Sequence, residues 1–205
     1  MAILNAATKE VQLKIVYYGP AMCGKTTNLV QVHKRVQTAP GNKGRLVSLA
    51  TNSDRTLFFD FLPIEAATVK GFKTKFQLYT VPGQVIYNAT RQLVLRGVDG
   101  IVFVADSQYS KMAENVESFQ NLEENLRMVK LSLADIPYVL QYNKRDLDGA
   151  APVDYLEFLL NSREVQVPSF EATAHDATGV FETLNSISRS MLSKFINQHA
   201  PQCAA

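Results

Sequence analysis

The stretch KIVYYGPAMCGKTTNL, residues 14–29, decides the fold. It opens with an apolar run of β-branched and aromatic residues, which is typical of a buried strand. Residues 19–26 then match the pattern G-x-x-x-x-G-K-[ST], and a helical pattern begins at Lys25. In this strand, loop and helix context, backbone N–H groups turn inward around a phosphate. Lys25 would place its charge on the β- and γ-phosphates, and the Thr26 hydroxyl would bind Mg²⁺.

Further strand patterns alternate with helical patterns along the chain. Apolar runs at 100–106, 137–143 and 167–172 predict strands of a mostly parallel sheet. Residues 72–81 alternate apolar and polar side chains, and 57–64 is expected to pair with them as an antiparallel hairpin. Helical patterns cover 25–37, 85–96, 112–130, 154–161 and 180–198. The sequence therefore predicts an α/β fold with a mixed, mostly parallel six-stranded sheet, one antiparallel hairpin and helices on both faces.

Composition limits the possible partners and compartments. A chain of 205 residues, 46% hydrophobic and 20% charged, predicts one globular domain over residues 1–205. The formal charge is only +2, without the basic excess typical of nucleic-acid binding. Apolar runs are too short for a membrane helix, and the N-terminus does not resemble a signal peptide. With two cysteines, we expect a cytoplasmic protein, no nucleic-acid partner and no membrane insertion.

A second motif indicates which base the nucleotide carries. Asn143, Lys144, Arg145 and Asp146 follow an apolar strand, at the edge where open α/β sheets bind ligands. A carboxylate at Asp146 can accept hydrogen bonds from N1–H and the exocyclic amine of guanine, whereas adenine offers no matching donor pair. The aliphatic stem of Lys144 would lie along the base. The motif favours GTP and argues against nucleotide kinases and transport ATPases.

The order of these motifs resembles that of small Ras-like GTPases, and their wording is similar to the MglA family of bacterial polarity and gliding-motility GTPases. The similar segments are KIVYYGPAMCGKTTNL, DRTLFFDFLP, GFKTKFQLYTVPGQ, GVDGIVFVADSQ and QYNKRDL. The resemblance covers about residues 9–198 and implies a P-loop NTPase of the small Ras-like GTPase fold that uses GTP, GDP and Mg²⁺. Residues 171–175, EATAH, resemble the E-x-S-A-K signature, in which Thr173 replaces Ser and the Ala174 N–H would reach guanine O6.

Thr80 stands where Ras-like proteins carry Asp in D-x-x-G-Q, and the resembling family shares this departure. An Asp there holds a Mg²⁺-bound water, while Thr80 offers a hydroxyl without charge, so weaker metal binding is expected. The Gly83 N–H would meet the γ-phosphate, and Gln84 would orient the attacking water. Arg91 and Arg96, on the following helix, are expected at the surface.

Residues 80–84 are one expected switch segment, a loop that responds to the bound nucleotide. A second is expected at the end of residues 38–56, which show no clear pattern. By resemblance, Thr56 would contact Mg²⁺ and the γ-phosphate only with GTP bound, and hydrolysis would release it. Arg55 resembles the intrinsic arginine finger of the MglA family. An activating partner would then only have to reposition Arg55 and Gln84. The resemblance implies that this partner is a Roadblock/LC7-type dimer, MglB-like, and that polarity or motility effectors are recruited at a cell pole.

These motifs define the predicted site and leave one alternative open. Catalysis is assigned to Gln84 and Arg55, and the metal to Thr26 and Thr56, with Thr80 as an outer-shell contact. The predicted nucleotide-binding residues are Gly19, Cys23, Gly24, Lys25, Thr26, Thr27, Thr56, Gly83, Asn143, Lys144, Asp146, Thr173 and Ala174. The leading hypothesis is a GTP-hydrolysing switch. The alternative is a GTP-dependent scaffold, in which Thr80 slows turnover so far that effector binding is the whole output.

Overall fold

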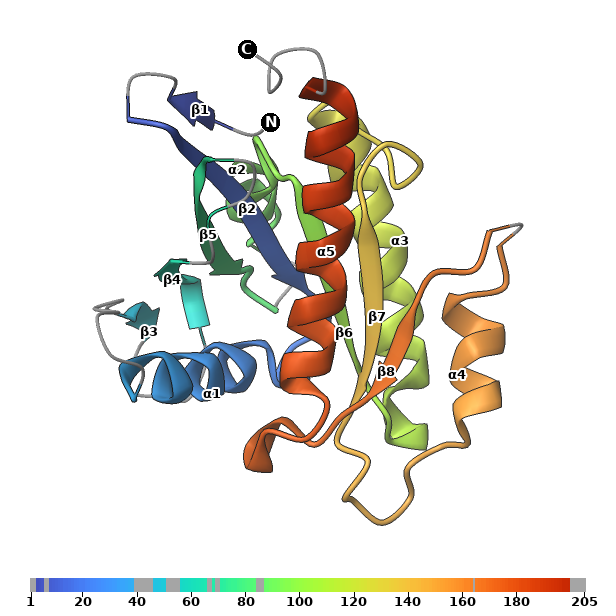
Figure 1. Cartoon of the computed structure of the whole chain (residues 1–205). Coiled ribbons are helices and arrows are strands. Elements are labelled where there is room, and N and C mark those ends of the chain that lie inside the picture. Colours follow the sequence, from blue (N-terminus) through green and yellow to red (C-terminus); the bar gives the residue numbers. More distant parts are fainter. Residues whose placement is uncertain are drawn as a thin grey trace.

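The computed structural model describes residues 3–5, 8–38, 46–50, 56–65, 68, 71–83, 87–163 and 165–199. Its centre is one twisted sheet (Figure 1) with the spatial order β3-β4-β5-β2-β6-β7-β8, and β1 pairs with the outer part of β2. The strands are β1 (Ile3–Asn5), β2 (Glu10–Tyr18), β3 (Val47–Ala50), β4 (Thr56–Glu65), β5 (Lys73–Thr80), β6 (Gly100–Asp106), β7 (Tyr138–Asn143) and β8 (Ser169–Glu171). Strands β5, β2, β6, β7 and β8 run parallel.

Five α-helices cover the two faces of the sheet (Figure 1). They are α1 (Lys25–Gln37), α2 (Asn88–Leu95), α3 (Met112–Met128), α4 (Val153–Leu160) and α5 (Val180–His199). Short 3₁₀ turns precede α3 at Tyr109–Lys111 and α5 at Ala174–Asp176. None of the helices in the described part of the chain is long and apolar enough to cross a membrane.

Side chains of β2 alternate between two cores, one on each face of the sheet. Leu13, Ile15 and Tyr17 belong to the core with Leu29 of α1 and Ile187 of α5. On the opposite face, Val16 and Tyr18 belong to the core with residues of α2, α3 and α4. Both faces of β6 and of the second half of β2 are thus buried, which explains why residues 15–18 and 101–105 are continuously apolar.

The predicted α/β fold with a mostly parallel sheet is confirmed. Strand β4 pairs antiparallel with β5, as predicted for the hairpin, with Phe61 opposite Tyr79. Two short strands add to the six that were predicted. Strand β3 pairs antiparallel with β4 inside the stretch that showed no pattern, and β1 pairs antiparallel with β2. Four residues give too little periodicity to mark a strand, so pairing with a long neighbour rather than the local sequence defines β3.

The parallel strands place five chain segments along one edge of the sheet. Strands β5, β2, β6, β7 and β8 end at Thr80, Tyr18, Asp106, Asn143 and Glu171. The loops that follow them contain every motif of the predicted site except the second switch segment. Open α/β sheets bind ligands at this carboxyl edge.

Candidate nucleotide-binding site

The loop between β2 and α1 has the backbone conformation that its glycines permit. Gly19 has φ +144° and Gly24 has φ +103°, both in the region that favours glycine. A Cβ on Gly19 would clash with the Val104 carbonyl, and one on Gly24 would clash with the Asn143 side chain. The two glycines therefore let this loop lie directly against β6 and the residue that ends β7.

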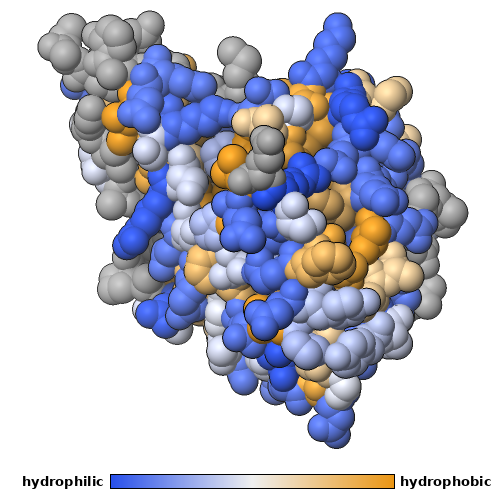
Figure 2. Space-filling view, turned by 90° about the vertical axis from the view of Figure 1, so that its right-hand side faces the viewer, coloured by the Kyte–Doolittle hydropathy of each residue, from blue (hydrophilic) through white to orange (hydrophobic). Residues whose placement is uncertain are grey.

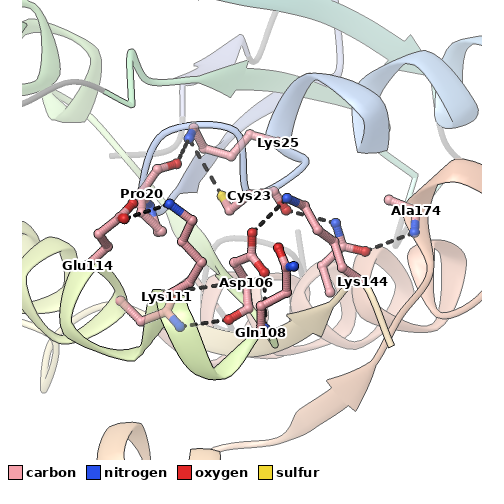
Figure 3. A network of polar contacts seen from close by, with 11 residues as sticks. Pro20, Cys23, Lys25, Asp106, Gln108, Lys111, Glu114, Lys144 and Ala174 are labelled. Carbon is pink, nitrogen blue, oxygen red and sulfur yellow. Dashed lines mark hydrogen bonds and ion pairs between the residues drawn. The ribbon is translucent and has the colours of Figure 1, made fainter. Parts of the chain in front are cut away.

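Lys25 bends back over this loop (Figure 3). Its Nζ donates hydrogen bonds to the carbonyls of Gly19 at 3.0 Å and Pro20 at 2.6 Å, and lies 3.6 Å from Cys23 Sγ. Burial lowers the pKa of Lys25, Cys23 acts in the opposite direction, and the positive charge of Arg91 lowers it further. Burial also raises the pKa of the Cys23 thiol, in keeping with a small, protonated loop residue. A phosphate placed here would gain a desolvated ammonium group.

A carboxylate that the sequence analysis did not select lies beside the two threonines assigned to the metal. Asp60 of β4 is fully buried, and its Oδ2 accepts hydrogen bonds from Thr26 Oγ1 at 2.6 Å and Thr80 Oγ1 at 2.9 Å. The Asp60 N–H in turn donates to Thr80 Oγ1 at 2.9 Å. Three oxygen-bearing side chains from α1, β4 and β5 thus meet at the start of α1. Such hard oxygen donors fit Mg²⁺.

Asn143 joins the phosphate loop to the segment after β8. Its Nδ2 donates to the Cys23 carbonyl at 2.7 Å, and its Oδ1 accepts from the Ala174 N–H at 2.8 Å. Both Thr173 and Ala174 are buried. The Arg145 N–H also donates to the Ala172 carbonyl at 3.1 Å, so the two predicted base-binding segments are held side by side.

Lys144 and Asp146 lie on the solvent side of this junction. Lys144 has φ +67°, and its Nζ lies 2.6 Å from the Oδ2 of Asp106, a buried carboxylate at the end of β6 (Figure 3). The Asp106 N–H and C=O are both paired with the side chain of Asn115. This ion pair fixes the direction of the Lys144 stem. Asp146 is exposed, with its carboxylate accessible to a base.

The switch residues are described only in part. Arg55 and Gln84 lie outside the described residues. Thr56 is the first residue of β4, and its side chain is also outside that description. Gly83 is described and lies against the phosphate loop, because a Cβ there would clash with the backbone of Ala21. Thr27, the remaining predicted contact, lies in the first turn of α1.

Three residues near the site were missed or misplaced by sequence reasoning. Asp60 and Asp106 are acidic residues within strands that are otherwise largely apolar, and that contrast was the available signal. Arg91 was expected at the surface, and this was wrong, since its side chain is 1% exposed and donates to the carbonyls of Pro82 and Gly83. Its helical spacing to Val94 and Leu95, both buried, marks the inner face of α2. Arg96 is exposed, as expected.

Comparison with known proteins agrees with this geometry. Residues 14–193 match the Ras family. The chain is 50% identical over 194 residues to the mutual gliding-motility protein MglA of Myxococcus xanthus (strain DK1622), covering 95% of this chain and 97% of that protein. It is 27% identical over 146 residues to the Ras-related protein RABD2a of Arabidopsis thaliana, covering 71% of this chain and 68% of that protein.

The glycine loop, the buried lysine and the paired base-binding segments define a small GTPase of the Ras type. The chain belongs to the Ras family, and within it the chain is MglA-like.

Proposed function

We propose that this protein is a GTP-binding and GTP-hydrolysing switch, built as one G domain, that controls cell polarity or motility. The observation that carries the proposal is the bridge made by Asn143. It joins the Cys23 carbonyl of the phosphate loop to the Ala174 N–H beside the predicted base pocket. One side chain therefore aligns the two halves of a nucleotide site. The similarity to a gliding-motility protein supports the cellular role.

Guanine selection is assigned to Asp146 and the Ala174 N–H. The exposed Asp146 carboxylate would accept from N1–H and the exocyclic amine of guanine, and the Ala174 N–H would face O6. Lys144 would support the ring with its stem, which the ion pair with Asp106 holds in place. Adenine would leave Asp146 without its two donors, which is unfavourable once water is excluded.

Thr26 and Thr56 would bind Mg²⁺ directly, and Asp60 and Thr80 would support it from the outer shell. When bound, Mg²⁺ neutralises charge on the β- and γ-phosphates. Asp60 supplies the negative charge that Thr80 lacks, from the neighbouring strand. This charge would offset the weaker metal binding expected from Thr80 alone.

Hydrolysis is assigned to Gln84 and Arg55. Gln84 would orient the attacking water, and Arg55 would place positive charge at the bridge between the β- and γ-phosphates, a contribution of about 10³–10⁵ in rate for arginine fingers. Turnover would be slow until a Roadblock/LC7-type dimer, MglB-like, repositions these residues. The GTP-bound form would recruit effectors at a cell pole.

The test is single-turnover hydrolysis of GTP with Mg²⁺, comparing the wild type with Arg55→Ala and Gln84→Leu. Arg96→Ala is the matched control, because it removes an exposed arginine outside the site. We expect both site variants to bind GTP and stall, while the control keeps the wild-type rate. Normal hydrolysis by Arg55→Ala in the presence of an activating dimer would refute the intrinsic finger.

The second candidate function is a GTP-dependent scaffold, in which Thr80, in place of an acidic residue, makes hydrolysis too slow to matter. If the wild type binds GTP tightly but does not turn it over, even with a Roadblock-domain dimer added, effector binding is the whole output. ATP binding as tight as GTP binding would refute the base assignment.

A further inference from the structure

Arg91 is the largest fully buried side chain of the described residues, and its hydrogen bonds converge on the segment that leads to Gln84. Its Nε donates to the Pro82 carbonyl at 2.9 Å, and its Nη2 donates to the Gly83 carbonyl at 2.6 Å. Its Nη1 donates to Asn121 Oδ1. A guanidinium stays charged in a protein, so burying it is costly unless its N–H groups are paired. Here Nε and Nη2 are paired with the carbonyls of two consecutive residues, Pro82 and Gly83.

Asparagines of α3 hold the guanidinium from the other side. Asn121 Oδ1 accepts from Arg91, from the Tyr18 hydroxyl at 2.7 Å and from Asn125 Nδ2 at 3.0 Å. The guanidinium carbon also lies 5.3 Å from the centre of the Tyr18 ring. Asn125 donates to Asn88 Oδ1 at 2.6 Å, which connects this cluster to the start of α2. Arg91 is thus fixed by several polar partners.

The bond to Pro82 sets the direction of the Gly83 N–H. The Pro82 carbonyl and the Gly83 N–H belong to the same peptide group, which is planar and trans, so they point in opposite directions. Because the carbonyl points to Arg91, the N–H points away from Arg91. Gly83 also lies against the phosphate loop, whose Ala21 backbone leaves no room for a Cβ on Gly83. The positive charge of Arg91 is also close enough to reinforce the lowering of the Lys25 pKa by burial.

We propose that Arg91 is a positioning residue that locks the Pro82 to Gly83 peptide with its N–H toward the phosphate loop, and so sets the preference of the site for GTP over GDP. This inference rests on the proposed GTP site, in which the Gly83 N–H contacts the γ-phosphate. GDP lacks that phosphate, so its binding does not use this peptide. Losing the lock therefore weakens GTP binding and leaves GDP binding in place.

The test measures the dissociation constants of GDP and of a non-hydrolysable GTP analogue, both with Mg²⁺, for the wild type, Arg91→Lys and Asn121→Ala. Lysine keeps the charge but loses the fork that reaches both carbonyls. For Arg91→Lys we expect about a tenfold loss of analogue affinity, the effect of about one hydrogen bond, with GDP affinity within about twofold of wild type. Asn121→Ala should shift the ratio of the two constants in the same direction by about threefold.

Arg96→Lys is the matched control, since it makes the same change at an exposed position after α2 and should leave both constants unchanged. If Arg91→Lys does not fold, the ratio for Asn121→Ala decides. An unchanged ratio, or equal losses for the two nucleotides, would overturn the inference and leave Arg91 a purely structural residue. A wild type that binds neither nucleotide would instead refute the proposed GTP site.

Discussion

Asp60 brings a carboxylate to a position where the motif itself has none. The motif that ends β5 has Thr80 in place of an acidic residue, yet the carboxylate of Asp60 accepts the Thr80 hydroxyl at 2.9 Å and the Thr26 hydroxyl at 2.6 Å. The charge thus comes from β4, 20 residues earlier in the chain. A motif search along β5 alone reports a defective metal site, whereas the folded chain has a carboxylate there.

Replacing Asp60 with Asn should weaken the binding of Mg²⁺, so that nucleotide binding needs more of it. The substitution keeps the shape and removes the charge, so the Mg²⁺ concentration at half-maximal binding of a GTP analogue should rise about tenfold or more. Titrating Mg²⁺ at fixed analogue measures this. Asp154→Asn, in the first turn of α4, is the control. A midpoint equal to that of the wild type would remove Asp60 from the metal site.

Replacing Asp146 with Asn should change the preferred base. The amide places a donor against the exocyclic amine of guanine, so GTP affinity should fall by about 100-fold or more, while xanthosine triphosphate, which has a carbonyl at that position, should gain. Competition between the two nucleotides for a fluorescent analogue measures the change. Asp148→Asn alters another exposed carboxylate of the same loop and should have no effect. Unaltered GTP affinity in Asp146→Asn would contradict the assigned base contact.

At the scale of elements, the hydrophobic pattern of the sequence predicted the strands and helices that depend mainly on neighbouring residues. The alternation in β5 and the apolar run of β4 predicted their antiparallel pairing, and the start of α1 at Lys25 follows from the glycine before it. Strand β3 and the burial of Arg91 could not be predicted in this way, because both depend on contacts between distant segments. The site motifs are local patterns and were recognisable in the sequence. The contacts of Asp60 with Thr26 and Thr80 depend on how β4 packs, so they were not.

A network of buried, hydrogen-bonded polar side chains holds α1 and α5 against β7. Gln141 donates to Asn28 Oδ1 and Thr183 Oγ1, both at 3.0 Å, and accepts from Asn28 Nδ2 at 2.8 Å. Asn28 Nδ2 also donates to the Gly24 carbonyl at 3.0 Å. The network therefore connects the phosphate loop to both helices on this face of the sheet.

Gln141→Leu should lower the free energy of unfolding by about 2 kcal/mol, because Asn28 and Thr183 lose a buried partner. Urea denaturation of the nucleotide-free protein measures the loss. Gln77→Leu is the control, since Gln77 pairs with Gln12 at 2.8 Å where both side chains are only partly buried, and a loss below about 0.5 kcal/mol is expected there. Equal losses in the two variants would mean that the polar network adds nothing specific.

At the scale of the whole molecule, nucleotide should stabilise the fold, because its site is assembled from both halves of the chain. Saturating GDP and Mg²⁺ at about 1,000 times the dissociation constant should add about 4 kcal/mol to the free energy of unfolding. Stripping the nucleotide with a chelator and phosphatase should remove this gain. The matched variant is Lys25→Ala, whose unfolding should not respond to GDP. A wild type equally indifferent to GDP would contradict the assigned site.

The side of the molecule that carries α4 exposes several apolar side chains. Phe158 and Val165 are 70% and 77% exposed, and the ring of Tyr155 lies 6.0 Å from that of Tyr109. Figure 2 shows that the apolar areas on this side are separated by hydrophilic ones. Isolated apolar side chains of this kind are normal on a folded surface.

Because every parallel strand ends at the same edge, the start of β2 and the end of α5 lie at the opposite edge (Figure 1). The 20 residues of α5 correspond to a helix of about 30 Å. A fluorescent reporter joined beyond α5 would therefore stand far from the bound nucleotide. We therefore expect such a fusion to leave the proposed nucleotide site unobstructed, so that the protein can be followed in living cells.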